Sequence, residues 1–213
     1  MSSASTNFTP QTHGFRFVNR FQVSLDFELP LIGAIDLGDL VLGLCGGMCF
    51  AALDYFDASR PVPTVSSPPG QGTTLHRYLV QRQIDSLVPP QGVLKVLSWT
   101  VMPDRDVWRQ TAGREFGKLR WRLDRGKPAV LALIRVGGLE GVTRNHQVVA
   151  RAYDFNDATK QLSVRVYDPN HPGSEPSLNM KLQNPASGIQ IKQSTGEPLR
   201  GFFVIDYRAK APP

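Results

Sequence analysis

The sequence contains two cysteines, Cys45 and Cys49, and both lie in the stretch LCGGMCFAALDYF at residues 44–56. Cys45 precedes two glycines and a run that is apolar around almost its whole circumference, which is typical of a buried helix. A thiol at the N-terminus of a helix lies at the positive end of the helix dipole, where its thiolate is stabilised. The sequence therefore identifies Cys45 as a candidate nucleophile, with Cys49 as the alternative nucleophile.

Cys49 would lie about one helical turn farther from that terminus, between Met48 and Phe50. Free cysteine is among the most buried residue types and packs as a small hydrophobic side chain. We therefore interpret Cys49 as a core residue. The glycines before it leave the backbone uncovered, so we expect the N–H groups around Gly46 to remain open to a ligand.

His146 and Asp168 are the residues that could activate such a thiol. His146 begins a strand-like segment after the loop GGLEGVTR, and Asp168 ends the next strand-like segment, in YDPNHPG. If the two strands are antiparallel neighbours, the start of the first lies beside the end of the second. An imidazole held by a carboxylate can accept the thiol proton and later protonate a leaving group. The sequence thus predicts His146 as general base and Asp168 as the group that orients it, although Asp-Pro is also ordinary β-turn chemistry.

Zinc binding is a different interpretation of the same residues. Cys45, Cys49, His146 and His171 could supply four ligands. However, the spacing Cys-x₃-Cys within one helix lacks the usual Cys-x₂-Cys knuckle, and the histidines are not paired. We therefore expect no metal and no other cofactor.

The elements that must position these side chains follow from the hydrophobic periodicity. An alternation between Phe15 and Phe27 predicts a strand, and the Ser/Thr/Asn-rich residues 1–13 are expected to be disordered. Helices are predicted at 46–58, 73–88 and 105–125, and a succession of strands follows Pro128. Helices first and strands second is typical of an α+β fold. We expect one domain at 14–213, with a helical half at about 40–126 and a β half at about 128–210.

Composition excludes several classes of protein. The chain of 213 residues is 41% hydrophobic and carries a net charge of +6, yet it has no Lys/Arg block, so we expect no nucleic-acid partner. Its N-terminus has neither the basic nor the apolar region of a secretory signal peptide, and no segment reaches the length of a membrane span. We expect a cytoplasmic protein, or one exported without a Sec signal.

The order of these motifs resembles the papain-like cysteine peptidase superfamily, over residues 40–58 and 128–175. CGGMCFAALDYF is similar to the Cys-bearing helix of the bacterial peptidases that remove double-glycine leaders, and NHQVVARAYDF and VRVYDPNHPG are similar to their His and Asp-Pro strands. The resemblance implies a buried Cys-bearing helix packed on a C-terminal antiparallel sheet, and hydrolysis of a peptide or amide bond in a peptide or protein substrate.

One position departs from that family. Its members usually carry a glutamine several residues before the cysteine, which helps to bind the oxyanion, whereas DLGDLVLGL at residues 36–44 contains none. Asn19, Gln22 and the backbone of Gly46 are the candidates for that role.

Three functions therefore remain open from the sequence. The first is a thiol hydrolase, the second is a deamidase or acyl-transferase with the same triad, and the third is a non-catalytic binding module that keeps the fold.

Overall fold

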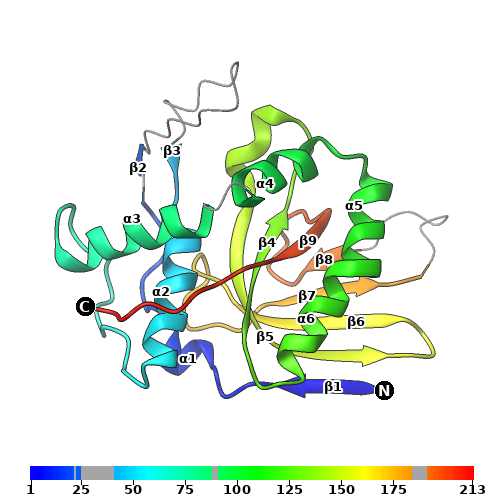
Figure 1. Ribbon diagram of the computed structural model, residues 1–213, viewed down its shortest axis with the longest axis horizontal. Helices are drawn as coiled ribbons and strands as arrows, with labels where there is room; N and C mark the ends of the chain where they lie inside the picture. Colours follow the sequence, from blue (N-terminus) through cyan, green and yellow to red (C-terminus); the bar gives the residue numbers. More distant parts are fainter. Residues whose placement is uncertain (22, 25–40, 88–90, 184–190) are drawn as a thin grey trace.

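The computed structural model describes residues 1–21, 23–24, 41–87, 91–183 and 191–213, and it confirms the predicted α+β class (Figure 1). The α-helices precede β4 to β9 in the chain, as expected, whereas β1 precedes them all. None of the helices in these described ranges is long and apolar enough to cross a membrane. The helices are α1 Pro10–His13, α2 Cys45–Asp57, α3 Thr74–Leu87, α4 Gln91–Val101, α5 Asp104–Gln110 and α6 Phe116–Leu123, with a π-helical turn at Thr111–Glu115 and a 3₁₀ helix at Leu139–Arg144.

The main sheet is antiparallel and has the strand order β8-β7-β6-β5-β4-β9. The first strand, β1, pairs with the second half of β5, beyond the stretch that pairs with β4. Two short strands, β2 Val23–Ser24 and β3 Val41–Leu42, form a separate ribbon. The strands of the main sheet are β1 Ser2–Ser5, β4 Ala129–Ile134, β5 His146–Asn156, β6 Gln161–Tyr167, β7 Ser177–Lys181, β8 Ile191–Gln193 and β9 Gly201–Ile205.

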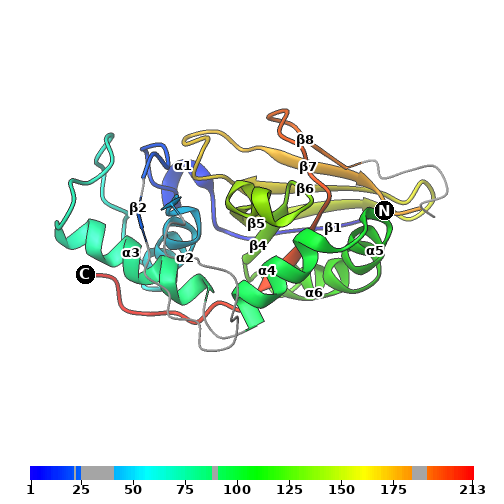
Figure 2. The same ribbon diagram turned by 90° about the horizontal axis from the view of Figure 1, so that it is seen from above.

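Both faces of the sheet are covered around β4, all six residues of which are buried. Alternate side chains of a strand point to opposite faces, so Val130 and Ala132 join the core that contains α2, whereas Leu131 and Leu133 join the core that contains α6. Figure 2 shows α2 and α6 on different sides of the strands. This double coverage explains why β4 reads as a continuous apolar run rather than as an alternating one.

The two glycines at the start of α2 allow close packing of that helix. A Cβ atom on Gly47 would lie 2.1 Å from the carbonyl oxygen of Leu79 in α3, and one on Gly46 would lie 2.2 Å from Ser86 Oγ. The Gly47 N–H is not open to a ligand, because it donates to Gln83 Oε1 at 2.8 Å. The expectation of an uncovered helix start is therefore wrong at Gly47, and the glycines serve the contact between α2 and α3.

The N-terminal residues 1–13 differ from the expectation of disorder. Ser2–Ser5 pairs with β5, Phe8 is fully buried, and α1 follows. The edge of β5 supplies hydrogen-bond partners for a segment that is rich in Ser, Thr and Asn. The composition of the segment does not indicate such a long-range partner.

Two further expectations are corrected. Residues 15–21 do not form a strand, although Phe15 and Phe17 are buried, and regular pairing in the described part of the predicted strand is limited to β2. The predicted helix at 105–125 is interrupted by the π-helical turn, and α4 was not predicted. The helix predicted at 46–58 and that at 73–88 are confirmed within two residues.

Asp54 lies in the last turn of α2 and joins three parts of the chain. It is fully buried and accepts five hydrogen bonds, from Tyr78 and Arg82 of α3 and from the C-terminal segment at Tyr207 and Lys210. The C-terminal segment crosses α2 in Figure 1. A buried carboxylate needs such compensation, so this cluster fixes α2 relative to α3.

Candidate active site

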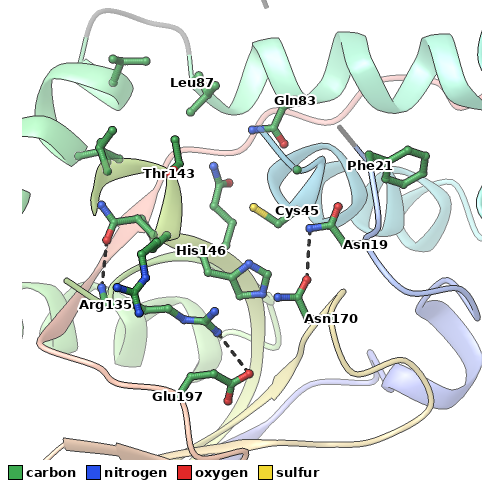
Figure 3. Close-up of a pocket in the computed structure, with 18 of the residues that line it drawn as sticks. Asn19, Phe21, Cys45, Gln83, Leu87, Arg135, Thr143, His146, Asn170 and Glu197 are labelled. Atoms are coloured by element: carbon green, nitrogen blue, oxygen red, sulfur yellow. Dashed lines mark hydrogen bonds and ion pairs between the residues drawn. The ribbon is translucent and has the colours of Figure 1, made fainter. Parts of the chain in front are cut away.

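Cys45 and His146 are each the first residue of their element, α2 and β5, and Asp168 directly follows β6. The prediction that β5 and β6 are antiparallel neighbours is confirmed, since Val149 pairs with Tyr167. The start of β5 and the end of β6 therefore lie at the same edge of the sheet, and α2 begins above that edge (Figure 3). The three residues are far apart in sequence. They come together because each lies at the end of its element and these ends meet at one edge of the sheet.

His146 and Asp168 form a buried pair. His146 Nε2 lies 2.6 Å from Asp168 Oδ1, and the two residues are 5% and 0% exposed. The same carboxylate oxygen accepts the Asn170 N–H at 2.8 Å, and the His171 N–H donates to the Asp168 carbonyl at 2.9 Å, as in a β-turn. The Asp-Pro-Asn turn therefore coexists with the pairing to His146 and holds the carboxylate in place.

The Cys45 thiol interacts with the other side of this imidazole. Burial raises the pKa of Cys45. The charge of His146, its hydrogen bond to the sulfur and the backbone N–H groups of Gln147 and Gly46 outweigh burial and leave the pKa lowered. Because Nε2 is paired with Asp168, Nδ1 is the ring nitrogen that remains for Cys45.

The pKa of His146 is shifted in the opposite direction to that of Cys45. Burial lowers its pKa, but the charges of Asp168 and Cys45 and their hydrogen bonds dominate and raise it to about 9. A lowered thiol pKa beside a raised imidazole pKa shifts the pair toward the thiolate–imidazolium form.

Cys49 differs from Cys45 in exposure and in the direction of its pKa shift. It is 0% exposed, its thiol donates to the Gln147 carbonyl at 3.4 Å, and burial together with the charges of Cys45 and Asp168 raises its pKa well above the usual value. Its environment is that of a packed core residue. In the part of the chain that is described, no cluster of three or more potential ligands could hold a metal ion, and His171 pairs with Glu197 at 2.7 Å.

Asn19 lies beside the start of α2, whereas Gln22 lies outside the described residues. Asn19 Oδ1 accepts the Leu44 N–H at 2.8 Å, and Asn19 Nδ2 donates to Asn170 Oδ1 at 3.2 Å. A Cβ atom on Gly43 would lie 2.8 Å from Asn19 Nδ2, so the glycine permits this approach. Figure 3 shows the Asn19 amide directed toward Cys45.

These residues line one end of a cavity of about 490 Å³. Its polar end holds Cys45, His146, Asn19 and Asn170, and its opposite wall is apolar and comes from α3, α4 and the 3₁₀ helix, through Leu87, Val93, Val96, Leu97 and Val142. The cavity gives a substrate access to the sulfur and offers apolar surface next to it.

Several polar residues around the site were missed by the sequence analysis. Gln83 is buried on α3, one turn after Leu79, and it faces the start of α2. Its i+4 spacing from a core leucine is the signal that could have placed it on the inner face. Arg135 and Gln193, which lie near Asp168, carried no comparable signal, because only the folding of the sheet brings them there.

Comparisons of the chain with family models, with curated proteins and with solved structures gave no match. The resemblance to papain-like peptidases, which rests on the sequence motifs, therefore stays a prediction.

Proposed function

We propose that the protein is a papain-like thiol hydrolase that cleaves a peptide or amide bond, with Cys45 as nucleophile, His146 as general acid and base, and Asp168 as the group that orients His146. One observation carries the proposal: a buried imidazole binds a buried carboxylate through one ring nitrogen and acts on a helix-terminal thiol from its other side. The proposed nucleophile therefore contacts the proposed base, and the base contacts the group that orients it.

The reaction uses these groups in sequence. The Cys45 thiolate attacks the carbonyl carbon and forms a tetrahedral oxyanion. The His146 imidazolium then protonates the leaving amine, which departs and leaves a thioester. Neutral His146 takes a proton from a water molecule, which attacks the thioester, and the acid product leaves with regeneration of the thiolate and the imidazolium.

The oxyanion needs donors near the sulfur. The backbone N–H of Cys45, at the start of α2, is one candidate. The Asn19 amide is the other, since an NH₂ group has two hydrogens and the bond to Asn170 uses one of them. Asn19 is thus the residue that we assign to the position where the local sequence before Cys45 lacks a glutamine.

The alternatives differ in how the acyl group leaves. A deamidase or an acyl-transferase would share every step up to the thioester. A binding module would not need a lowered thiol pKa, and this feature of Cys45 therefore supports a catalytic protein over that alternative.

Selective alkylation of Cys45 tests the proposal. At pH 6, iodoacetamide should modify Cys45 at least ~10-fold faster than Cys49, because thiolate and exposure set the rate. Intact mass and peptide mapping would measure both sites, with Cys45→Ala and Cys49→Ala as the matched pair of variants. Equal labelling of the two cysteines, or none at Cys45, would refute the catalytic assignment.

Replacing Asn19 by alanine should lower kcat for amide hydrolysis by about 10²–10³-fold, because one oxyanion donor is lost. The iodoacetamide rate of Cys45 should change less than about threefold, since alkylation forms no oxyanion. Stopped assays on a fluorogenic peptide that wild type cleaves would measure kcat. A parallel loss of both rates would mean that Asn19 only supports the fold of the site.

A further inference from the structure

We propose that Gln193 and Arg135 are positioning residues that fix the Asp168 carboxylate against His146, and that Glu197 balances the charge of Arg135. The inference rests on the proposed function, because it assigns supporting residues to the same Cys45–His146–Asp168 site. None of the three residues was a candidate from the sequence.

Gln193, the last residue of β8, bridges an anion and a cation. It is 3% exposed, its Nε2 donates to Asp168 Oδ2 at 2.9 Å, and its Oε1 accepts from Arg135 Nη2 at 3.2 Å. The reverse orientation of the amide would place its oxygen against the carboxylate and its NH₂ against the guanidinium. The charges on both sides therefore fix which way Gln193 points.

The second carboxylate oxygen of Asp168 is thus held independently of the first. Oδ1 binds His146 Nε2 and the Asn170 N–H, and Oδ2 binds Gln193. With both oxygens bonded, the carboxylate plane cannot rotate without breaking a buried hydrogen bond. The direction in which Asp168 holds the imidazole is therefore set from β8.

Arg135 adds charge without competing for the His146 contact. Its Nη2 lies 3.9 Å from Asp168 Oδ2 and 3.9 Å from Glu197 Oε1, and its side chain is 10% exposed. Neither contact is a direct hydrogen bond at that length. Arg135 thus stabilises the ionised Asp168 through space, and Asp168 Oδ1 remains available to His146.

Glu197 faces Arg135 from the segment between β8 and β9. Its carboxylate also accepts from His171 Nε2 at 2.7 Å, and it is one of the residues that line the cavity. Figure 3 shows Arg135 and Glu197 side by side below His146. Removing either charge changes the net charge next to the site by one unit, in opposite directions.

The pKa shifts agree with this arrangement. Burial by itself raises the pKa of Asp168. The charge and hydrogen bond of His146, the Asn170 N–H and the charge of Arg135 lower it by more than burial raises it, so the pKa of Asp168 is lowered overall. The charge of Arg135 also helps to lower the pKa of Glu197. The titratable groups that face Asp168 or its charged neighbours are Cys45, Cys49, His146, Tyr167, His171 and Glu197.

The pH profile of Cys45 alkylation tests the proposal on the full-length protein. Iodoacetamide rates between pH 4 and 10 give the midpoint of the acid limb. Arg135→Gln removes a positive charge and should raise that midpoint by about 0.5–1 pH unit, whereas Glu197→Gln removes a negative charge and should lower it by a similar amount. Arg135→Lys keeps the charge and should stay within about 0.2 unit of wild type.

Opposite shifts of the midpoint are the signature that a purely structural role would not produce. Arg109→Gln, which removes an exposed charge on α5 paired with Asp106, is the matched control and should leave the midpoint unchanged. Gln193→Leu should keep Cys45 labelling but lower kcat on a cleaved peptide by about 10-fold or more, because Asp168 loses its anchor.

Each outcome decides the proposal. Shifts of the same sign in Arg135→Gln and Glu197→Gln, or no shift in either, would overturn it. If Arg135→Gln does not fold, the sign of the shift in Glu197→Gln decides alone. Absence of selective Cys45 labelling in wild type would instead refute the proposed function itself, so the two failures are distinguishable.

Discussion

Replacing His146 by alanine should lower the rate at which Cys45 reacts with iodoacetamide at pH 6 by roughly 100-fold or more. Burial by itself raises the pKa of Cys45, and His146 is the main group that brings it down. Without the imidazole, a thiol with a pKa of about 8.5 or higher is less than about 1% ionised at pH 6. Alkylation kinetics followed by intact mass would measure the loss.

Under the proposed function, hydrolysis should be slowed more than alkylation in the same variant. Loss of the general acid costs a further ~10²–10⁴-fold, because the leaving amine must depart unprotonated. In wild type, hydrolysis should also fall as the pH rises through about 9, the pKa of His146, since the imidazolium then loses its proton. His76→Ala, which changes a histidine outside the cavity, is the control. Wild-type alkylation in His146→Ala would remove the basis for a catalytic pair.

Replacing Asp54 by alanine should destabilise the fold by about 3–5 kcal/mol, because the buried guanidinium of Arg82 loses its fully buried carboxylate and keeps only the partly exposed Asp85. Arg82 Nε lies 2.7 Å from Asp54 Oδ2 and is 1% exposed. The same change also breaks the anchors of Tyr207 and Lys210 on α2. Urea denaturation followed by circular dichroism would measure the free energy of unfolding.

Asp57 provides the matched control for this experiment. It lies one turn after Asp54 on α2 and also accepts from the Tyr207 hydroxyl, at 3.1 Å, but in an exposed contact. Asp57→Ala should therefore cost less than about 1 kcal/mol. Equal losses in the two variants would show that the buried cluster contributes no more than the surface contact.

The sequence predicted those parts that depend on short-range patterns. The apolar run after Cys45 gave α2 within two residues, and the succession of strands after Pro128 gave the antiparallel pair β5 and β6. The positions of His146 and Asp168 at strand ends followed from that pairing. The prediction of disorder at the N-terminus was wrong, because it used local composition alone. Ser2–Ser5 forms a strand only by pairing with the edge of β5, which the local sequence does not indicate.

The polar contacts of α2 also depend on distant segments rather than on the local sequence. Asp54 interrupts a helix that is otherwise apolar around its circumference, and nothing near it in the sequence indicates that Arg82 and Tyr207 compensate its charge. Gly46 and Gly47 resembled an open helix start, but Gly47 packs against the backbone of α3 at Leu79, and Gly46 packs against the side chains of Ser86 and Gln147.

The sequence by itself determined the α+β class, the buried helix that follows Cys45 and the order of Cys45, His146 and Asp168 along the chain. The class and the helix follow from hydrophobic periodicity, which is encoded in neighbouring residues, and the order of the three residues can be read directly from the chain. Only the tertiary structure decided that Cys45 rather than Cys49 has the lowered pKa, that Asn19 lies beside α2, and that Gln193 binds Asp168 with Arg135 close to it. The physical reason is that burial and charge compensation are set by residues from distant segments, which the chain brings together only when it folds.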